Sequence, residues 1–506
     1  MIEMETIDFL TSLLTRLFVL SLLAGVLTIV VLYIIDVRQT EHAIRRNYPV
    51  VGRFRYLFEH LGEFFRQYFF SMDREEMPFN RAERSWAYRA AKGEDTTVAF
   101  GSTRDLRPVG SILFVNCAYP TLDEDAQPTT FVTMGPYCAK PYSMDSVFNI
   151  SGMSFGSISK PAVQALSAGA KKAGIWMNTG EGGLSPYHLE GGADIVFQIG
   201  TAKYGVRDAL GGLSDDRLRE LAAHEQVKMF EIKLSQGAKP GKGGILPGEK
   251  VTAEIARIRA IEVGVSSISP NRHPEVKSAA GLLDMIHRVR SVTSKPTGIK
   301  VAIGATAWLD DLCREINRRG IESAPDFITI DSADGGTGAA PMSLIDFVGL
   351  PIKESLPLVV DILTSHGVRD RIKVIASGKL ITPAQAAWAL CVGADFIVSA
   401  RGFMFALGCI QALQCNKNTC PTGITTHDKK LQRGLNVIDK TERVASYATA
   451  MRKEIHIIAH SCGVSEPRKL KRLHARIVGN DGRSTPLDEL YPEQVPSTRA
   501  AVVAYD

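Results

Sequence analysis

From residue 147 onward, short β-rich runs alternate with stretches of helical pattern, and this alternation constrains the fold more than any other feature. Such alternation predicts parallel strands joined by crossover helices. Eight units favour a closed (β/α)8 TIM barrel. A doubly wound open sheet is the alternative, but no Gly-x-Gly-x-x-Gly turn follows the first run. The predicted strands are residues 147–150, 174–177, 229–234, 265–269, 297–302, 326–331, 373–377 and 395–399.

Helix-start signals support the alternation. Thr382-Pro-Ala-Gln385 has the spacing of a capping box with proline at the first helical position, so a helix is expected directly after the seventh strand. Pro161, which follows Ser159, plays a similar part after the first strand.

The cysteines are concentrated near the end of this region. Cys409, Cys415 and Cys420, three of the eight, lie within twelve residues. Such a group can hold a metal or cluster, form disulfides, or lie inertly in a core. The run ends in Cys-Pro, as many iron–sulfur ligand runs do, whereas zinc would usually need a fourth ligand, for which His427 is the nearby candidate. The spacing favours an iron–sulfur site and leaves the other readings open.

Residues that directly follow the strands are candidate site residues, because chemistry in barrels takes place at the carboxyl ends of the strands. Gly152, Met153 and Ser154 follow the first strand, where a turn of small residues either permits a tight bend or lets backbone approach a flat ring. Glu181 stands among glycines after the second strand, as a solvated residue or an acid–base group. Gln236 and Lys239 follow the third predicted strand and suit an anionic substrate, although surface lysines are the ordinary expectation.

Lys300 lies inside the fifth predicted strand, between apolar neighbours. A buried lysine is costly without an anionic partner. Flavin barrels commonly aim such a cation at the N1–O2 edge of the ring, where negative charge develops on reduction. The last three strands all end near glycine, which predicts a phosphate cradle of backbone amides. The residues assigned to this cradle are Gly335, Gly336, Gly378, Arg401 and Gly402.

The motif Cys-x5-Cys-x4-Cys-Pro-x-Gly, preceded by a strand and a glycine-containing turn, resembles the FMN-binding synthase domain of glutamate synthases. Four further signatures of that family occur in order, at residues 151–159, 178–183, 233–241 and 334–338. The resemblance implies FMN bound in the barrel and a [3Fe-4S] cluster on Cys409, Cys415 and Cys420.

The resemblance also assigns individual residues. It implies that Glu181 manages protons and that Gln236 and Lys239 bind 2-oxoglutarate. Thr179, Gln198 and Lys203 are placed near the flavin, with Lys203 standing where the family usually has arginine.

The reaction implied by the resemblance is that of an oxidoreductase acting on CH–NH2 donors. Ammonia and 2-oxoglutarate would give 2-iminoglutarate, and hydride from reduced FMN would give glutamate, with the cluster feeding electrons to FMN. No cysteine nucleophile heads the chain, and neither a Rossmann fingerprint nor a second cysteine cluster occurs. We therefore expect ammonia from solution or a partner, and electrons from a ferredoxin or reductase subunit.

Two alternative functions remain open. One is synthesis of an N-substituted glutamate, such as N-methylglutamate, from an amine. The other is a membrane-tethered flavin and iron–sulfur electron-transfer protein that acts on another substrate. A formal net charge of +5, without a basic stripe interleaved with aromatic residues, does not suggest nucleic-acid binding.

The N-terminal region contains an apolar run. Residues 17–35 are nineteen consecutive positions without a charge, enough to span a hydrocarbon core of about 30 Å. We predict a retained single-pass anchor; the alternative is a cleaved signal peptide, whose apolar region is normally shorter. Flanking charges place the large C-terminal part in the cytoplasm by the positive-inside rule. Glu3, Glu5 and Asp8 precede the run, Arg16 lies at its edge, and Arg38, Arg45, Arg46, Arg53 and Arg55 follow it.

The predicted domain organisation has four parts. Residues 1–36 form the anchor, 37–146 a juxtamembrane amphipathic segment and lead-in subdomain, 147–425 the barrel with the cysteine motif, and 426–506 a helical C-terminal extension. In the segment 51–70 one face is apolar, and that face either lies on a membrane surface or packs against the barrel. The apolar positions at helical spacing are Phe54, Leu57, Phe58, Leu61, Phe64 and Phe65.

Overall fold

A computed structural model describes residues 2–494, apart from the side chains of residues 2–5, 63 and 64. The side chains of Glu3, Glu5 and Phe64, and residues 495–506 of the predicted C-terminal extension, lie outside the described part. The chain forms two compact units, which divide between residues 82 and 83. The four-part organisation stays a prediction.

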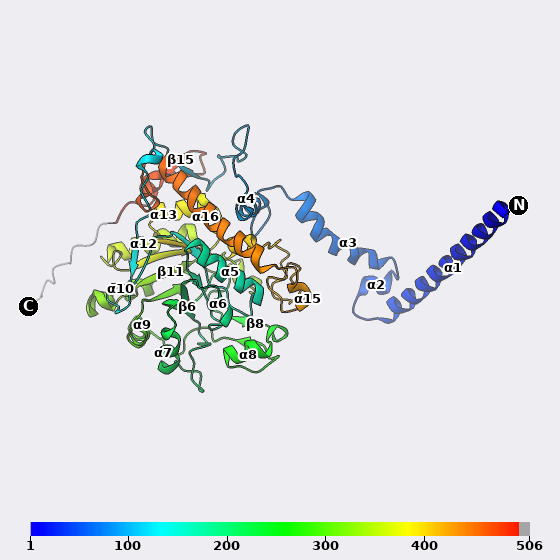
Figure 1. Ribbon diagram of the computed structural model, residues 1–506, viewed down its shortest axis with the longest axis horizontal. Helices are drawn as coiled ribbons and strands as arrows, with labels where there is room; N and C mark the ends of the chain where they lie inside the picture. Colours follow the sequence, from blue (N-terminus) through cyan, green and yellow to red (C-terminus); the bar gives the residue numbers. More distant parts are fainter. Residues whose placement is uncertain (1, 495–506) are drawn as a thin grey trace, which may run out of the picture. The chain divides into compact units, whose positions relative to one another are not determined.

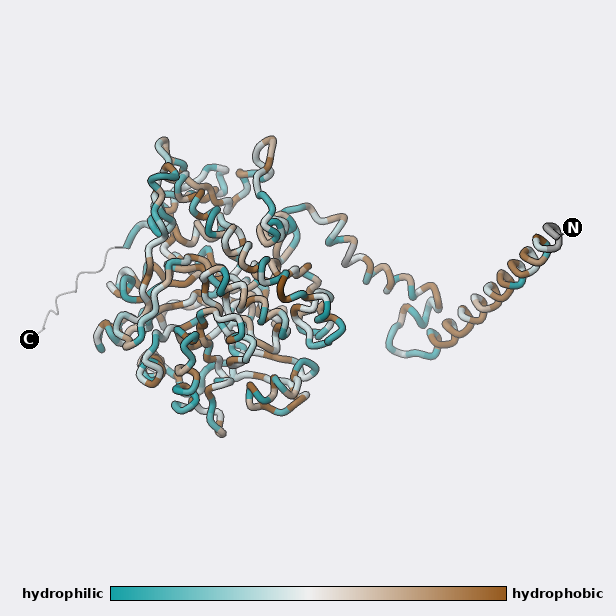
Figure 2. Tube along the Cα trace, in the orientation of Figure 1, coloured by the Kyte–Doolittle hydropathy of each residue, from teal (hydrophilic) through white to brown (hydrophobic). Residues whose placement is uncertain are grey.

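The first unit is helical (Figure 1). It contains α1 (Ile2–Arg38), α2 (Ala43–Asn47), α3 (Gly52–Phe65) and a single-turn π-helix, η1 (Arg66–Phe70). Within α1, residues 6–38 are long and apolar enough to cross a membrane, and Figure 2 shows this helix mainly in the hydrophobic colour, with white and a few hydrophilic positions between. By length and composition, such a helix is compatible with an anchor and also with a signal sequence.

The second unit is built on a closed parallel barrel, so the predicted (β/α)8 fold is confirmed. Neighbouring strands all pair in parallel, and β13 closes the ring by pairing with β4, Ser399 opposite Ile150. The strands in ring order are β4 (Phe148–Ile150), β5 (Met177–Asn178), β6 (Ile195–Ile199), β7 (Val227–Lys233), β10 (Thr297–Val301), β11 (Phe327–Asp331), β12 (Lys373–Ser377) and β13 (Phe396–Ser399).

One predicted barrel strand is wrong and another was missed. Residues 265–269 do not enter the barrel: β9 (Ser267–Ile268) instead pairs antiparallel with β8 (Ile245–Leu246), and the Ile268 side chain is exposed. The missing barrel strand is β6, whose five residues are all buried. Lys233 therefore lies on the fourth barrel strand rather than the third, while Lys300 remains on the fifth.

Helices follow the strands and surround the ring. The predicted capping box forms at Thr382 and Gln385, and α13 ends at Gly393 in the left-handed conformation. The Ser159 side chain caps α5 by accepting from the Ala162 amide. The helices of this region are α5 (Lys160–Ala173), α6 (Pro186–Glu190), α7 (Asp215–Ala223), α8 (Ala253–Arg259), α9 (Ala279–Thr293), α10 (Ala307–Arg319), α11 (Met342–Ile345), α12 (Ile352–Ser365), α13 (Pro383–Val392) and α14 (Arg401–Ala406), with 3-10 turns η3 (Gly248–Lys250) and η4 (Ile321–Ser323).

A hairpin from the lead-in region closes the amino-terminal end of the barrel. It consists of β2 (Val132–Met134) and β3 (Tyr142–Met144), and its side chains share one apolar cluster with residues at the starts of barrel strands, such as Phe327 and Phe396. Because this end is filled, ligands can enter only from the other end. The rest of the lead-in comprises α4 (Arg81–Lys92), β1 (Ile112–Phe114) and the 3-10 turn η2 (Asp123–Asp125).

The C-terminal part packs on the flank of the barrel. Its long helix α16 (Val437–Ser461) lies beside α5 (Figure 1), and a methyl group on Gly169 of α5 would lie 2.5 Å from Val444. The remaining elements are α15 (Lys429–Gln432), η5 (Pro467–Lys469), η6 (Arg472–His474), β14 (Ala475–Val478), β15 (Ser484–Pro486) and α17 (Leu487–Leu490); β14 and β15 form a sheet with β1. The predicted C-terminal helices are confirmed, although two strands accompany them.

Asp326, the residue before β11, links the starts of neighbouring barrel strands. Its carboxylate is fully buried and pairs with Arg371 at 2.6 Å and Arg290 at 3.1 Å. It also accepts from the Thr297 amide at 2.7 Å, at the start of β10. Removing the charge would leave two guanidinium groups buried without their anion, which is costly.

We expect Asp326→Asn to lower the free energy of unfolding by about 3–5 kcal/mol, the usual cost of breaking a buried ion pair. The matched control is Asp311→Asn, which breaks an exposed pair with Arg314 and should cost less than about 1 kcal/mol. Urea unfolding of the full chain in detergent measures both. If both variants lowered the free energy of unfolding by the same small amount, a structural role for the buried pair would be contradicted.

Candidate functional site

Two adjoining hollows lie where the barrel strands end. One is a cleft of about 760 Å³ that is open to solvent, and the other encloses about 530 Å³. They are continuous because they share lining residues from five strand ends. The shared residues are Gly152, Gln198, Lys233, Gln236, Gly336, Ala400 and Arg401.

Most of the residues predicted from the sequence line these hollows. The structure brings together there Gly152, Met153, Ser154, Glu181, Gln198, Gln236, Lys239, Lys300, Gly336, Gly378 and Arg401. Cys415 also lines the open cleft, so the cysteine motif borders the same space.

Four predicted cofactor residues do not line either hollow. Thr179 is buried behind the wall, where its hydroxyl accepts from the Gln198 amide at 3.1 Å. Lys203 is buried and pairs with Glu275 at 3.1 Å. The Gly335 amide bonds to the Ser332 carbonyl, and Gly402 packs against Tyr447. These residues support the wall, and their assignment to the cofactor stays a prediction.

Lys300 is buried inside the barrel beside a second lysine. It lies opposite Lys233 in the register of β10 and β7, and two adjacent ammonium groups require anions close by. Its Nζ lies 3.3 Å from Asp331 Oδ2. Burial alone would lower the pKa of Lys300, but the Asp331 and Glu231 carboxylates raise it above its usual value. Lys300 therefore remains a cation in the core.

Glu231 is a site residue that the sequence reasoning missed. It is buried on β7 and accepts three hydrogen bonds, from Gln198 Nε2 at 2.6 Å, Thr329 Oγ1 at 2.6 Å and Asn178 Nδ2 at 2.8 Å. An ionised carboxylate only accepts, so it fixes both amides with their NH2 groups toward it. Gln198 itself lines both hollows. An acidic residue inside a largely apolar strand is the sequence signal from which Glu231 could have been predicted.

Glu181 is held between two glycine backbones and a lysine. Methyl groups on Gly200 and Gly244 would lie within 2.6 Å of its side chain, so only glycine leaves room. Its carboxylate pairs with Lys233 at 3.1 Å. Burial would raise the pKa of Glu181, but Lys233 holds it below its usual value. Near neutral pH it is therefore ionised and ready to accept a proton.

The segment after β7 forms one wall of the cleft. Gln236 Nε2 donates to Thr337 Oγ1 at 3.2 Å, and Lys239 Nζ donates to the Ala339 carbonyl at 2.9 Å. Burial lowers the pKa of Lys239 to about 8, although Glu181 opposes the shift. This lysine is thus a cation that can lose its proton in the physiological range.

The strand ends at β11, β12 and β13 fit a flat ligand that carries a phosphate group. Gly378 has φ +106°, and a methyl group there would lie 2.4 Å from the Ser332 side chain, so only glycine allows the strand ends to approach this closely. A methyl group on Gly336 would lie 2.5 Å from Arg401 Nε. Arg401 thus places a guanidinium against exposed backbone at the wall, a suitable environment for phosphate.

The three cysteines of the motif are surrounded by cations. Arg401 Nη1 lies 3.8 Å from Cys415 Sγ, and Lys250 Nζ donates to the Cys415 carbonyl at 3.1 Å. Burial raises the pKa of Cys409; burial acts the same way on Cys420, but hydrogen bonds from Thr422 and Thr425 lower its pKa overall. The surroundings therefore favour the thiolate form at Cys420 and oppose it at Cys409.

The metal assignment of the three cysteines stays a prediction. Among residues 2–494, no group of three or more His, Cys, Asp or Glu side chains is placed to hold a metal ion. Lys250 also donates to the Ser157 carbonyl at 2.9 Å, so it links the cysteine segment to the turn after β4.

Residues 118–465 match the family described as the conserved region in glutamate synthase. The glutamate synthase large subunit-like protein YerD of Bacillus subtilis (strain 168) is 40% identical over 498 residues, covering 91% of this chain and 94% of that protein. The archaeal-type glutamate synthase (NADPH) of Thermotoga maritima is 33% identical over 323 residues, covering 63% of this chain and 60% of that protein. The chain thus spans less than two thirds of the length of this second relative.

Solved structures with a similar chain course have low sequence identity. Mandelate oxidase with (S)-4-hydroxymandelic acid is 14% identical with a TM-score of 0.46, covering 79% of this chain and 91% of that chain. This likeness adds nothing to the barrel topology described above. The family match covers the whole barrel and both sides of the cleft, and the chain therefore belongs to the glutamate synthase family.

Proposed function

We propose that the protein is an iron–sulfur flavoprotein that reductively aminates 2-oxoglutarate to glutamate through 2-iminoglutarate. The observation that carries the proposal is the convergence of Glu181, Lys239 and Cys415 on the open cleft, with Lys300 in the adjoining hollow that shares part of its wall. A dianionic substrate, an acid–base group and an electron source would meet there.

The substrate part of the proposal rests on the segment after β7. Lys239 and Gln236 offer a cation and an amide to the carboxylates of 2-oxoglutarate, and they are fixed by the contacts with Thr337 and Ala339. Glu181, ionised beside Lys233, is placed to take the proton that the nitrogen releases after ammonia or an amine has added to the keto carbon. Burial of these groups excludes much of the water that would screen them.

The cofactor part rests on the strand ends and the cysteine motif. When bound, FMN would supply hydride chemistry, and a [3Fe-4S] cluster on Cys409, Cys415 and Cys420 would supply electrons one at a time. Lys300 would hold the flavin N1–O2 edge, Gln198 would hydrogen-bond to the ring, and Arg401 with Gly336 and Gly378 would hold the phosphate. Arg401 borders both the cleft and Cys415, which supports placing the two cofactors side by side.

The cellular part rests on the first unit. We infer that α1 is a retained single-pass anchor, because residues 6–38 are long and apolar enough to cross a membrane and most of the flanking arginines follow the apolar run. The catalytic unit would then face the cytoplasm. The electron donor would be a ferredoxin or a reductase subunit.

Binding of 2-oxoglutarate should weaken as pH rises through about 8, because Lys239 loses its proton there. Loss of one charge-assisted hydrogen bond of about 1.5–3 kcal/mol predicts a rise in Kd of several-fold, up to about tenfold, between pH 7 and 9. Anaerobic titration followed through the flavin absorbance measures it. In Lys239→Arg the profile should be flat, since guanidinium stays charged. No spectral change at any pH would contradict the substrate, and a flat wild-type profile would contradict the role of Lys239.

Replacing Cys415 or Cys420 with serine should abolish the EPR signal of the cluster and most of the bound iron, while FMN remains. Glutamate formation from the physiological donor should fall by more than the roughly 10–100-fold that mutation of a ligand's outer-shell partner produces. Cys117→Ser, which changes a half-buried thiol outside the motif, should leave iron and EPR signal intact. A wild-type protein that is yellow after anaerobic purification but contains no iron would overturn the cluster.

A further inference from the structure

Helix α3, together with the π-helical turn η1, carries an apolar face. Phe54 stacks on Phe58 with ring centroids 6.4 Å apart, and Phe65 lies against Phe69 at 5.5 Å. On a helical projection the apolar positions of α3 and η1 fall on one side, while Arg55 and Glu59 fall on the other. Figure 2 shows the resulting alternation of hydrophobic and hydrophilic residues along α3, in contrast with α1.

This apolar face is exposed. Phe58 is 64% exposed, Phe54 55% and Phe69 74%. An exposed apolar surface of this kind indicates an interaction with another molecule or with lipid. The exposed apolar residues of the face are Phe54, Leu57, Phe58, Phe65, Tyr68 and Phe69.

A buried ion pair locks the start of α3 to the end of α1. Asp36 follows Ile35, the last residue of the uncharged run, and is only 1% exposed. Its carboxylate accepts from Arg53 Nη2 at 2.7 Å and Nε at 2.8 Å, and from the Val50 amide at 2.9 Å. The first turn of α3 is therefore held at the level where the apolar run of α1 ends.

The short helix α2 completes this elbow. A methyl group on Gly52 would lie 2.9 Å from the Ile44 carbonyl, so α3 begins in direct contact with α2. The Arg45 guanidinium lies 4.7 Å from the centre of the Tyr56 ring, and His42 packs on the same ring at 5.0 Å. The elbow is thus a packed joint rather than a loose linker.

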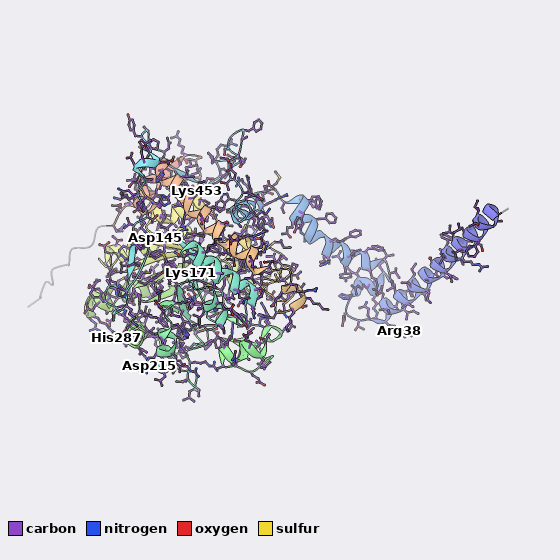
Figure 3. All side chains as sticks on the ribbon, viewed as in Figure 1. Arg38, Asp145, Lys171, Asp215, His287 and Lys453 are labelled. Atoms are coloured by element: carbon purple, nitrogen blue, oxygen red, sulfur yellow. The ribbon has the colours of Figure 1, made fainter. Side chains whose placement is uncertain are left out.

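Exposed arginines surround the joint. Arg38, labelled in Figure 3 at the end of α1, and Arg46 and Arg55 are all exposed. Arginines beside an apolar aromatic face match the boundary between anionic headgroups and acyl chains, where aromatic side chains also gather. A face that only packed on protein would not need this ring of cations.

We propose that α3 and η1 lie in the headgroup region of a bilayer that contains anionic phospholipid, with the face Phe54 to Phe69 turned toward the acyl chains. The inference rests on the proposed anchoring by α1, because the elbow sets the depth of α3 from the end of the span. The protein then has two membrane contacts, one across the bilayer and one along its surface.

The test uses the full chain in vesicles of phosphatidylcholine and phosphatidylglycerol. An environment-sensitive fluorescent amino acid replaces Phe58 in one variant, the adjacent polar-face residue Glu59 in a second, and Leu27 of α1 in a third. Each is measured with lipids brominated near the headgroup or near the middle of the chain. At position 58 we expect a blue-shifted emission, quenched several-fold more by the shallow bromines than by the deep ones. At position 59 quenching should be weak, and at position 27 the deep bromines should dominate.

The outcomes separate the two layers of the proposal. No quenching at position 27 would overturn the anchoring, and the surface helix with it. Deep quenching at 27 without quenching at 58 would leave the anchor and overturn the surface helix; blue-shifted emission at 58 would then indicate packing on protein, either the barrel or a second copy. Equal quenching at 58 and 59 would also overturn it. Reduced quenching at 58 in Asp36→Asn would support the role of the elbow in setting depth.

Discussion

The site depends on a buried cation, Lys300, held between two carboxylates inside the barrel. A lysine in this position would be strongly destabilising without them, because a lone charge in a low-dielectric core is expensive. Asp331 lies 3.3 Å from its Nζ, and Glu231 adds a second negative charge from β7. The partners in turn organise the wall: Asp331 accepts from the Gly237 amide and the Ser377 hydroxyl, and Glu231 orients Asn178 and Gln198.

The same electrostatic arrangement connects the segment after β7, the strand ends that line the hollows and the cysteine motif. The Gly237 amide that bonds to Asp331 belongs to the segment that carries Gln236 and Lys239. Lys250 joins the turn after β4 to the cysteine segment by two backbone contacts, at 2.9 Å and 3.1 Å. Chemistry at one end of the barrel is therefore coupled to packing in its core, and the hairpin of β2 and β3 keeps the opposite end closed.

The barrel and most of the cleft residues could be predicted from the sequence because their signals are local. The capping box at Thr382 and the glycines after the last strands depend on short-range geometry. Strand β6 was missed and residues 265–269 were misassigned because short apolar runs look alike, and only pairing decides which enters the ring. Glu231 was overlooked, although a charged residue inside an apolar barrel strand needs polar partners in the same way as Lys300. The partner of Lys203, Glu275, is far along the chain, and no local pattern reveals such a pair.

The most direct test of this account is the reduction potential of the bound flavin in Lys300→Met. Removing the cation should lower the potential, because the reduced ring loses the positive charge that stabilises its N1–O2 edge. Lys353→Met, which removes an exposed lysine from α12, should leave the potential unchanged. A Lys300→Met protein that binds a full complement of FMN at the wild-type potential would contradict the account.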